Sequence, residues 1–503
     1  MTRFIACSFP LRCSHAPATL LAFGICLFGN AALTAEEPYV SWATTGSNMY
    51  SAELTTISPS GDLYTASGDI FTGRGLLRFT PSGELAEQVV YPGLEVQGLT
   101  FDAVGNRYLT GSVWTNGTFS ASHPKGFFVA RFNAQNELVW VRSGDEVDRE
   151  FTRGTAVRLD AEGNICVGGS IRRPETWEAY APGDHDGIFL RKYSPEGDLL
   201  WARRMEHQNS GWWYDANVYD LSVDPTGRVV ISGSLSSGVT TFGDTTVYPG
   251  STDCSNWFLA RYLPNGDLHW VQLGCSQSIA TDRNGNIYAS VGFAENVGAG
   301  LVKLAPDGTA IWSMDLPGYL EWPGGLTLDR DDEPVFTGAF VGTAQLGQFT
   351  LRSHGSSFED FFVAKASAQG EIQWAMSGGG AGFDRGEQVV CDAQGNIYLT
   401  GVIRKNVATF DGFILTPRQG PDSPTLFAAK LSPVPPLRLR QAGGITTLTW
   451  PAKATNWMLE ATGTLGTPAW GPANLSSTVS GRDRTATVDT AAATSRFYRL
   501  RKP

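Results

Sequence analysis

The stretch from Asp392 to Gly401, Asp-Ala-Gln-Gly-Asn-Ile-Tyr-Leu-Thr-Gly, decides the fold of this chain. Its first five residues have the composition of a tight turn, because an aspartate accepts hydrogen bonds from its own turn and a glycine takes positive φ. The flanking segments, Gln388–Cys391 and Ile397–Thr400, are mostly apolar or β-branched, as is typical of strands. The stretch therefore predicts two short strands joined by a turn.

The same pattern, Asp-x-x-Gly-Asn-x-Tyr-x-x-Gly, recurs along the chain. A second good copy spans Asp102–Gly111. Weaker copies lie at Asp160–Gly169, Asp224–Gly233, Asp282–Val291, Ser58–Ser67 and Asp329–Gly338. A unit that recurs every few tens of residues is the signature of a repeat architecture. Each of the seven copies therefore predicts one structural repeat.

A second motif, a basic residue followed by a glycine and then a tryptophan, alternates with the first. In one copy, Lys365 precedes Gly370 and Trp374. The other basic and tryptophan positions are Arg131 with Trp140, Lys192 with Trp201, Arg261 with Trp270 and Lys303 with Trp312. Each pair would face across a hairpin between the third and fourth strands of a unit, where we expect a cation–π contact.

The two ends of the repeat region complement each other. The last basic strand, Leu426–Lys430, has no tryptophan after it. The N-terminal segment Tyr39–Ala43 resembles the tryptophan strand Glu371–Ala375 and has no basic strand before it. We therefore predict an all-β fold, a seven-bladed β-propeller closed by the N-terminal strand. Such closure leaves only short, protected sheet edges.

Further segments flank the propeller, which we place at residues 36–431. Residues 1–35 contain arginines, a short apolar run and small residues, in the order found in a cleaved signal peptide. The apolar run is well below the roughly 20 residues that a membrane-spanning helix needs. We therefore expect an exported protein in an extracellular, cell-surface or periplasmic location. Residues 432–436 form a linker, and alternating short strands predict a small C-terminal β-sandwich-like domain at residues 437–503.

The repeats resemble the SBBP-type β-propeller repeat family, which is found in exported bacterial proteins. The resemblance rests on Asp392–Gly401 with Phe361–Trp374, and on Thr241–Gly243 and Ala344–Leu351 between strands. It covers about residues 38–431 and implies a propeller. It implies no particular activity, because a fold does not determine a function.

Charge and motif content exclude several classes of function. The 503 residues include 38 basic and 49 acidic side chains, a net charge of −11, and contain no basic run. Nucleic-acid binding usually needs a clustered basic face, so we expect no nucleic-acid partner. The chain has no Gly-x-Ser-x-Gly, no His-Glu-x-x-His and only six histidines. We predict no cofactor, no metal and no catalytic residues.

The candidate binding residues lie in the long connections. The connections from first to second and from third to fourth strand are tight turns, so every insertion falls on one face, where binding is expected. Aromatic and carboxylate side chains there suit sugar rings and their hydroxyls, although the aromatics can equally fold their loops onto the blades. The candidates are Trp212, Trp213, Tyr214, Asp215, Trp177, Tyr180, Asp184, His185 and Asp186.

The cysteines and the turn aspartates have mainly structural interpretations. Cys254 and Cys275 flank one hairpin at matching distances from its turn, and a disulfide between them is reasonable in an exported chain. Cys166 and Cys391 are expected to be buried, apolar side chains. The Asp-x-x-Gly-Asn turns lack the further oxygen ligands of a calcium loop, so their aspartates are predicted to stabilise turns.

These observations favour a non-catalytic, secreted or cell-surface binding or adhesion propeller. Its partner would be an extracellular glycan or a surface protein, bound by the long-loop face. One alternative is a propeller enzyme, either polysaccharide lyase-like or quinoprotein-like. The other is a purely structural surface protein.

Overall fold

Nearly all regular structure in the described part of the chain is β-strand. The computed structural model describes residues 36–48, 52, 54–67, 75–113, 119, 126–143, 152–171, 186–209, 216–235, 238–249, 256–274, 276–291, 300–316, 323–355, 358–417, 424–442, 445–464, 469–489 and 496–502. Over these residues there is no α-helix, and so none long and apolar enough to cross a bilayer.

Seven antiparallel sheets each contain four strands in a row, and we number the sheets by their position in the chain. Sheet 1 consists of β2 (Leu54–Ile57), β3 (Leu63–Ser67), β4 (Gly75–Phe79) and β5 (Leu85–Val89). Sheet 2 consists of β6 (Leu94–Phe101), β7 (Arg107–Val113), β8 (Gly126–Phe132) and β9 (Leu138–Ser143), and sheet 3 of β10 (Arg153–Leu159), β11 (Ile165–Ile171), β12 (Asp186–Tyr193) and β13 (Leu199–Asn209). Sheet 4 consists of β14 (Asn217–Val223), β15 (Val229–Ser234), β18 (Trp257–Tyr262) and β19 (Leu268–Leu273). Sheets 5 to 7 consist of β20 (Ile279–Thr281), β21 (Ile287–Val291), β22 (Gly300–Leu304) and β23 (Ala310–Asp315); β24 (Pro323–Leu328), β25 (Pro334–Phe340), β28 (Asp360–Ala366) and β29 (Ile372–Gly379); and β30 (Arg385–Cys391), β31 (Ile397–Ile403), β34 (Thr425–Ser432) and β1 (Tyr39–Asn48).

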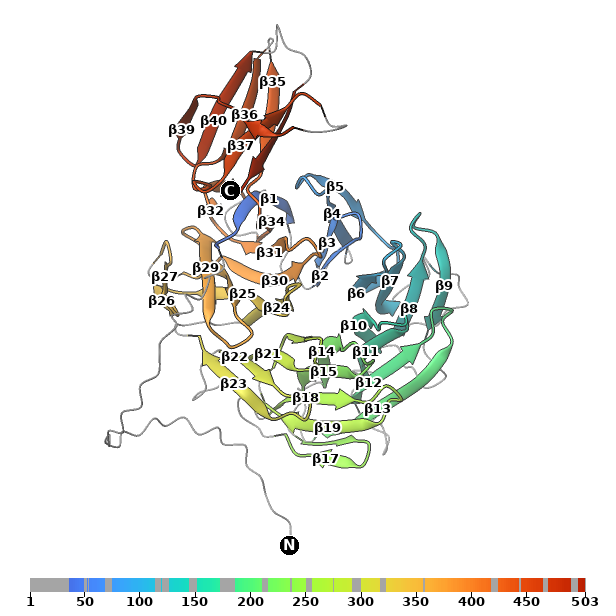
Figure 1. Ribbon diagram of the computed structural model, residues 1–503. Coiled ribbons are helices and arrows are strands. Elements are labelled where there is room, and N and C mark those ends of the chain that lie inside the picture. Colours follow the sequence, from blue (N-terminus) through green and yellow to red (C-terminus); the bar gives the residue numbers. More distant parts are fainter. Residues whose placement is uncertain are drawn as a thin grey trace, which may run out of the picture. The chain divides into compact units, whose positions relative to one another are not determined.

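The first strands of these sheets form a closed ring. Strand β2 contacts β6, and the contacts continue through β10, β14, β20 and β24 to β30. Strand β30 then contacts β2, which closes the ring. Figure 1 shows the sheets in sequence order around it, from blue to orange. This arrangement of radial antiparallel sheets is a β-propeller.

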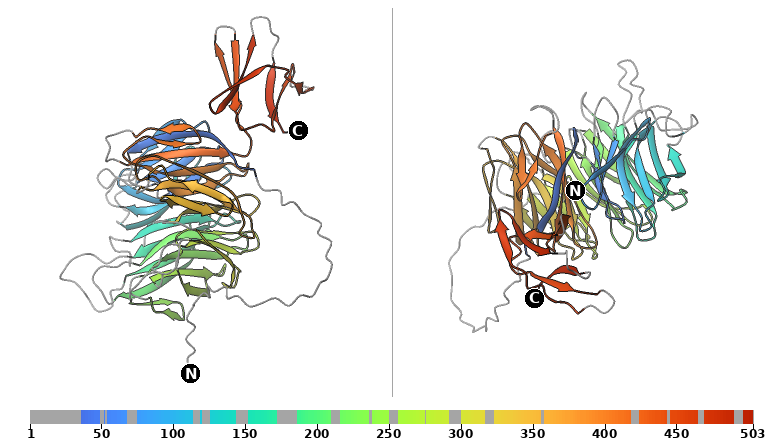
Figure 2. Two further views of the ribbon diagram at one scale, coloured as in Figure 1. Left: turned by 90° about the vertical axis from the view of Figure 1, so that its left-hand side faces the viewer. Right: turned by 90° about the horizontal axis from the view of Figure 1, so that it is seen from above.

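The outermost strand of sheet 7 comes from the other end of the chain. Strand β1 pairs antiparallel with β34, from Tyr39 opposite Ser432 to Asn48 opposite Thr425. Both views of Figure 2 show the blue strand beside the orange ones. The sequence predicted this pairing from the tryptophan that is missing after Lys430.

The repeat aspartates hold their own turns. In sheet 2, Asp102 Oδ1 accepts the backbone N–H groups of Val104 at 3.1 Å and Asn106 at 2.9 Å. Its Oδ2 accepts the Asn106 side chain at 2.7 Å. The same bonds recur at Asp160, Asp282 and Asp392. The interpretation of these aspartates as turn stabilisers agrees with these bonds.

The repeat tryptophans join neighbouring sheets. Trp140 Nε1 in sheet 2 donates to the Pro195 carbonyl in the β12–β13 turn of sheet 3, at 3.0 Å. The indole ring covers Gly197 in that turn, where a Cβ atom would lie 2.9 Å from the ring. The same bond links Trp42 to Pro81, Trp201 to Pro264, Trp270 to Pro306 and Trp312 to Ala368. The Gly and Trp of the second motif therefore belong to one inter-sheet contact.

In the described part of the chain, the basic residues of the repeats do not make the cation–π contacts with tryptophan that we expected from the sequence. Lys303 and Trp312 do face each other across the hairpin, but the ammonium lies over the Tyr288 ring, 4.6 Å from its centre, and 3.5 Å from Asp282. Buried cations need a negative partner, and the turn aspartate supplies it better than an indole. Equivalent ion pairs join Lys192 to Asp160, Arg261 to Asp224 and Lys365 to Asp329.

Three additional hairpins arise between second and third strands. They consist of β16 (Gly238–Phe242) with β17 (Thr245–Val247), β26 (Thr343–Leu346) with β27 (Phe349–Arg352), and β32 (Ala408–Phe410) with β33 (Phe413–Leu415). Strand β16 pairs with β13 of the preceding sheet, and β32 pairs in the same way with β29. These two hairpins cover outer edges that would otherwise expose unpaired backbone groups, whereas β26 and β27 form a two-stranded sheet of their own.

Two further sheets follow the ring. One has the order β35 (Arg438–Ala442), β36 (Ile445–Pro451), β40 (Asp483–Asp489) and β39 (Ser477–Ser480), and the other has the order β38 (Gly471–Pro472), β37 (Met458–Thr462) and β41 (Phe497–Arg501). They share one hydrophobic cluster that contains Leu448 and Trp450, and Tyr39 from the first strand packs into it. Arg438 also donates to the Ser41 carbonyl at 2.7 Å.

Candidate functional site

The first strands of all seven sheets line one central pocket. Its volume is about 1110 Å³, slightly above the usual range of about 300–1,000 Å³ for ligand sites. Lining residues come from β2, β6, β10, β14, β20, β24 and β30. Because each sheet supplies one wall strand, the repeat architecture builds a cavity whose walls can differ strand by strand.

Several of these strands carry a β-bulge at equivalent positions along the strand. In β14, Val218 and Asp220 face successive residues of β15, so Tyr219 between them is an extra residue. The corresponding extra residues in β6, β10 and β30 are Gln97, Thr155 and Glu387. All four line the pocket. Bulges commonly occur next to active sites, where they redirect a side chain.

The last glycine of the repeat motif makes room for the bulge. A Cβ atom on Gly401 would lie 2.0 Å from the carbonyl oxygen of Arg385, at the start of the bulged strand. The equivalent distances are 1.8 Å between Gly111 and the Glu95 oxygen and 1.9 Å between Gly233 and the Asn217 oxygen. Only glycine avoids this overlap. The last glycine of the motif therefore indicates a bulge in the pocket wall, whereas from the sequence we interpreted it only as a strand residue.

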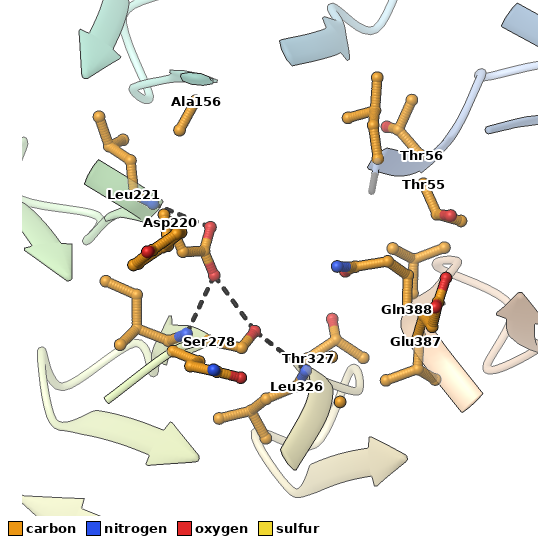
Figure 3. Close-up of a pocket in the computed structure, with 18 of the residues that line it drawn as sticks. Thr55, Thr56, Ala156, Asp220, Leu221, Ser278, Leu326, Thr327, Glu387 and Gln388 are labelled. Atoms are coloured by element: carbon orange, nitrogen blue, oxygen red, sulfur yellow. Dashed lines mark hydrogen bonds between the residues drawn. The ribbon is translucent and has the colours of Figure 1, made fainter. Parts of the chain in front are cut away.

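Asp220 forms a fixed anionic point on one wall. Its Oδ1 accepts Arg158 Nη2 at 3.1 Å, and its Oδ2 accepts the Ser278 hydroxyl at 3.2 Å and the Ile279 N–H at 3.0 Å. The Ser278 oxygen in turn accepts the Leu326 N–H at 3.1 Å (Figure 3). This network connects sheets 3 to 6 along this wall and holds the carboxylate in one orientation.

Glu387 and Gln388 stand on the wall opposite Asp220 (Figure 3). Glu387 Oε2 accepts the backbone N–H of Ala52, which ties sheet 7 to the beginning of sheet 1. Thr55 beside them shares a 2.6 Å hydrogen bond with Thr400. The pocket thus presents two carboxylates from opposite sides.

Cations outnumber anions in the described lining. The arginines are Arg153, Arg158, Arg385 and Arg404, and the carboxylates are Asp220 and Glu387. The chain as a whole has a net charge of −11, so the pocket reverses the sign of the molecule locally. A concave region of one sign focuses the electrostatic field and attracts ligands of opposite charge. This pocket is therefore suited to an anion.

An aromatic pair lies beside the arginines. The rings of Tyr219 and Trp257 stack with centres 5.1 Å apart and planes at 28°, and both residues line the pocket. Tyr219 is 49 % exposed, and its hydroxyl accepts the Ser234 hydroxyl at 3.1 Å. An exposed flat ring offers an apolar surface with a polar tip.

Most of the ligand residues predicted from the sequence lie outside the described residues. This applies to Trp212, Trp213, Tyr214, Asp215, Trp177, Tyr180, Asp184 and His185. Asp186 begins β12 and pairs with His207 through its backbone. The structure therefore neither supports nor excludes a binding site on those loops, and the residues that line the pocket are different ones.

The predicted cysteine sites also fall partly outside the described residues. Cys254 and Cys275 lie outside the described residues, so their disulfide stays a prediction. Cys166 and Cys391 are free thiols, the first buried and the second half-buried. Burial raises the pKa of Cys166 to about 12 and also raises the pKa of Cys391, so both are protonated and unreactive at neutral pH.

Comparison with known proteins identifies no family for this chain. No protein-family model and no curated protein matches the sequence. Among solved structures, regucalcin, a calcium-binding protein from Agrobacterium tumefaciens, matches at 13% identity and a TM-score of 0.33, over 58% of this chain and 86% of that chain. A gluconolactonase from Xanthomonas campestris matches at 15% identity and 0.34, over 58% and 84%. A europium-containing methanol dehydrogenase matches at 10% identity and 0.34, over 78% and 92%.

The prediction of a non-catalytic binding or adhesion propeller is wrong on this comparison, since two of these three matches are enzymes. The alternative of a propeller enzyme fits them better. There is also a physical reason, because ionisable residues line the central pocket. At 10–15% identity and TM-scores of 0.33–0.34, these matches assign no substrate and no residue to this chain.

Proposed function

We propose that the chain is an exported, seven-bladed β-propeller enzyme whose active site is the central pocket. In this proposal sheets 1 to 7 are the blades, β1 closes the ring, and residues 437–503 form a small C-terminal β-domain. The seven four-stranded sheets and the ring of contacts between their first strands support the architecture. The mixed ionisable lining of the pocket supports catalysis.

The proposed substrate is a polysaccharide that carries carboxylate groups. The observation that carries this proposal is the excess of arginines over carboxylates among the described lining residues. Arginine binds carboxylates through two parallel hydrogen bonds, which gives both attraction and orientation. The stacked pair of Tyr219 and Trp257 would support a sugar ring next to the arginines.

The proposed reaction is β-elimination, which a uronate residue undergoes when its carboxylate is neutralised. A base removes the proton at C5, the bond from C4 to its oxygen breaks, the electron pair forms the C4–C5 double bond, and an acid protonates the leaving oxygen. Glu387 is the candidate base, and the Tyr219 hydroxyl is the candidate acid. Asp220 is held by four donors, Arg158, Ser278 and the backbone N–H groups of Leu221 and Ile279, which suits it to orient Arg158 rather than to accept a proton.

The test is an assay for unsaturated sugar ends. The purified full chain is incubated with polygalacturonate, alginate and chondroitin sulfate, and the ultraviolet absorbance of the unsaturated product is followed. We expect at least one acidic polymer to give product and neutral amylose to give none. Changing Arg404→Ala should reduce turnover, whereas Arg283→Ala, an exposed arginine outside the pocket, should not. Absence of product from every acidic polymer would refute the proposal.

A further inference from the structure

Two buried carboxylates meet where sheets 6 and 7 adjoin the pocket. Asp360 is the first residue of β28, and Asp384 directly precedes β30. Both side chains are fully buried. Asp384 also donates its backbone N–H to the Glu359 carbonyl at 2.8 Å, so the two segments are joined.

Each carboxyl has one oxygen bonded and one oxygen without a hydrogen-bond partner among the described residues. Asp360 Oδ2 accepts the backbone N–H and the Nδ1 of His354, at 2.9 and 2.6 Å. Asp384 Oδ1 accepts the Arg404 N–H at 3.0 Å. Asp360 Oδ1 and Asp384 Oδ2 are the unpartnered atoms. A buried unpartnered carboxylate oxygen is costly, and protonation removes much of that cost.

The charged groups nearby are committed to other partners. Arg385 binds Glu359 through Nε and Nη2, the latter at 3.1 Å from Oε1. The Lys405 ammonium lies over the rings of Phe358 and Phe383, at 5.1 and 5.7 Å. His354 is half-exposed and bonds only Asp360 among the described residues. No described arginine or lysine therefore neutralises the two aspartates.

Burial is the largest cause that raises the pKa of Asp384, to about 7, and the neighbouring charge of Asp360 raises it further. Burial also raises the pKa of Asp360, against the lowering effect of its bonds to His354. The backbone N–H of Gly380 lowers the pKa of both carboxyls. Two like charges in one buried site cannot both ionise cheaply.

This pair lies directly behind two arginines of the pocket. Arg385 follows Asp384 in the chain, and Arg404 is held by Asp384 through its backbone N–H. Both arginines are among the residues that line the pocket. We propose that Asp360 and Asp384 hold one proton between them and act as a positioning pair for Arg385 and Arg404. Loss of that proton puts two negative charges behind the arginines and draws their positive field away from the pocket.

The sign of the stability effect follows from the raised pKa values. Both groups bind a proton more tightly in the folded than in the unfolded chain. Their contribution to stability is therefore complete below the ordinary aspartate pKa, near 4, and is lost as the pH rises through about 7. The folded protein should become less stable between pH 5 and pH 8 because of this pair.

The first test compares thermal unfolding of the full chain at pH 5 and pH 8. From pH 5 to pH 8 the Tm should fall less in Asp384→Asn than in the wild type, and the two decreases should differ by about 2 °C or more. Asp360→Asn should show the same reduced pH dependence, and it serves if the first variant does not fold. Asp267→Asn, an exposed carboxyl, is the matched control and should behave as the wild type. Equal pH dependence in wild type and both pair variants would overturn the proposal.

A second measurement needs no variant. Infrared difference spectra of the wild type should show a protonated carboxyl band that disappears as the pH passes through neutrality. Absence of that band would also overturn the proposal. These readouts do not depend on the proposed function.

A third arm does rest on the proposed function and tests the link to the arginines. Affinity for a galacturonate oligomer should weaken by about threefold or more from pH 6 to pH 8 in the wild type and stay nearly constant in Asp384→Asn. If the oligomer does not bind at any pH while the Tm results hold, the substrate proposal fails and the shared proton stands. Equal weakening in both proteins would overturn the positioning role.

Discussion

Asp282 in a repeat turn and Asp384 beside the central pocket are both buried, at 3 % and 0 % exposed. Both oxygens of Asp282 are satisfied, by the backbone of Asn284 and Asn286, the Asn286 side chain and the Lys303 ammonium. Asp384 has one backbone donor and one unpartnered oxygen. An aspartate at a turn thus stabilises the fold, because both of its oxygens have partners. The aspartate near the pocket keeps an oxygen without a partner and has a raised pKa, and such groups are expected at functional sites.

The largest effect on stability should come from a turn aspartate. Asp224→Ala leaves the buried Arg261 guanidinium without its anion, and such a loss costs about 3–5 kcal/mol of unfolding free energy. Urea unfolding measures it. The control Asp267→Ala removes an exposed partner of Arg203 and should cost no more than about 1 kcal/mol. Equal losses in the two variants would show that the buried ion pairs do not stabilise the turns.

The next largest loss of stability should come from a change at Gly401, the glycine that makes room for the bulge. Gly401→Ala places a Cβ atom against the backbone oxygen of Arg385, so the chain must shift, and we expect a loss of about 2–3 kcal/mol. Gly274→Ala, where the added atom meets nothing within 4 Å, is the control and should unfold nearly as the wild type does. An unchanged urea midpoint for Gly401→Ala would mean that the bulge is not required.

A smaller effect should follow from loss of one inter-sheet hydrogen bond. Trp140→Phe keeps an aromatic ring over Gly197 but removes the donor to the Pro195 carbonyl, and a single such bond contributes about 1 kcal/mol. Urea unfolding of Trp140→Phe and Trp140→Ala separates the bond from the ring. If the two variants lose equal stability, the ring packing contributes nothing.

The smallest effect on stability should occur in the pocket, with the largest effect on activity. Asp220→Asn keeps the size of the side chain and one accepting oxygen, and it should cost about 1 kcal/mol. If the pocket is the active site, turnover should fall by about 100-fold, because Arg158 loses its anchor. Unfolding and product formation are measured on the same preparation. Unchanged turnover would remove Asp220 from the site.

Local turn chemistry explains why so much of the fold was predictable. The Asp-x-x-Gly-Asn turns and the basic and tryptophan strands are written in each repeat, and the tryptophan missing after Lys430 indicated the partner of Tyr39–Ala43. The cation–π expectation failed because the partner of Lys303 depends on which group lies nearest across the sheet, and Tyr288 with Asp282 lies nearer than Trp312.

The pocket was much less predictable from the sequence. The side chains that meet there come from separate repeats, and which of them point inward depends on bulges such as the one at Tyr219, which shift the alternation of a strand by one residue. Tyr219 and Trp257 also meet only in the folded sheet. The one local signal was the glycine that ends most copies of the motif, which marks where a bulge passes.

The pairing of β1 with β34 sets the order in which this chain can fold. Ser41 and Ser432, which share a hydrogen bond of 2.9 Å, are 391 residues apart, so the ring cannot close until nearly the whole propeller has been synthesised. Contacts of such separation form slowly. Until then the edge of β34 is open, and β1 of a second molecule can occupy it as well as the chain's own strand. Refolding at high protein concentration should therefore yield strand-exchanged dimers, and dilution should favour the monomer.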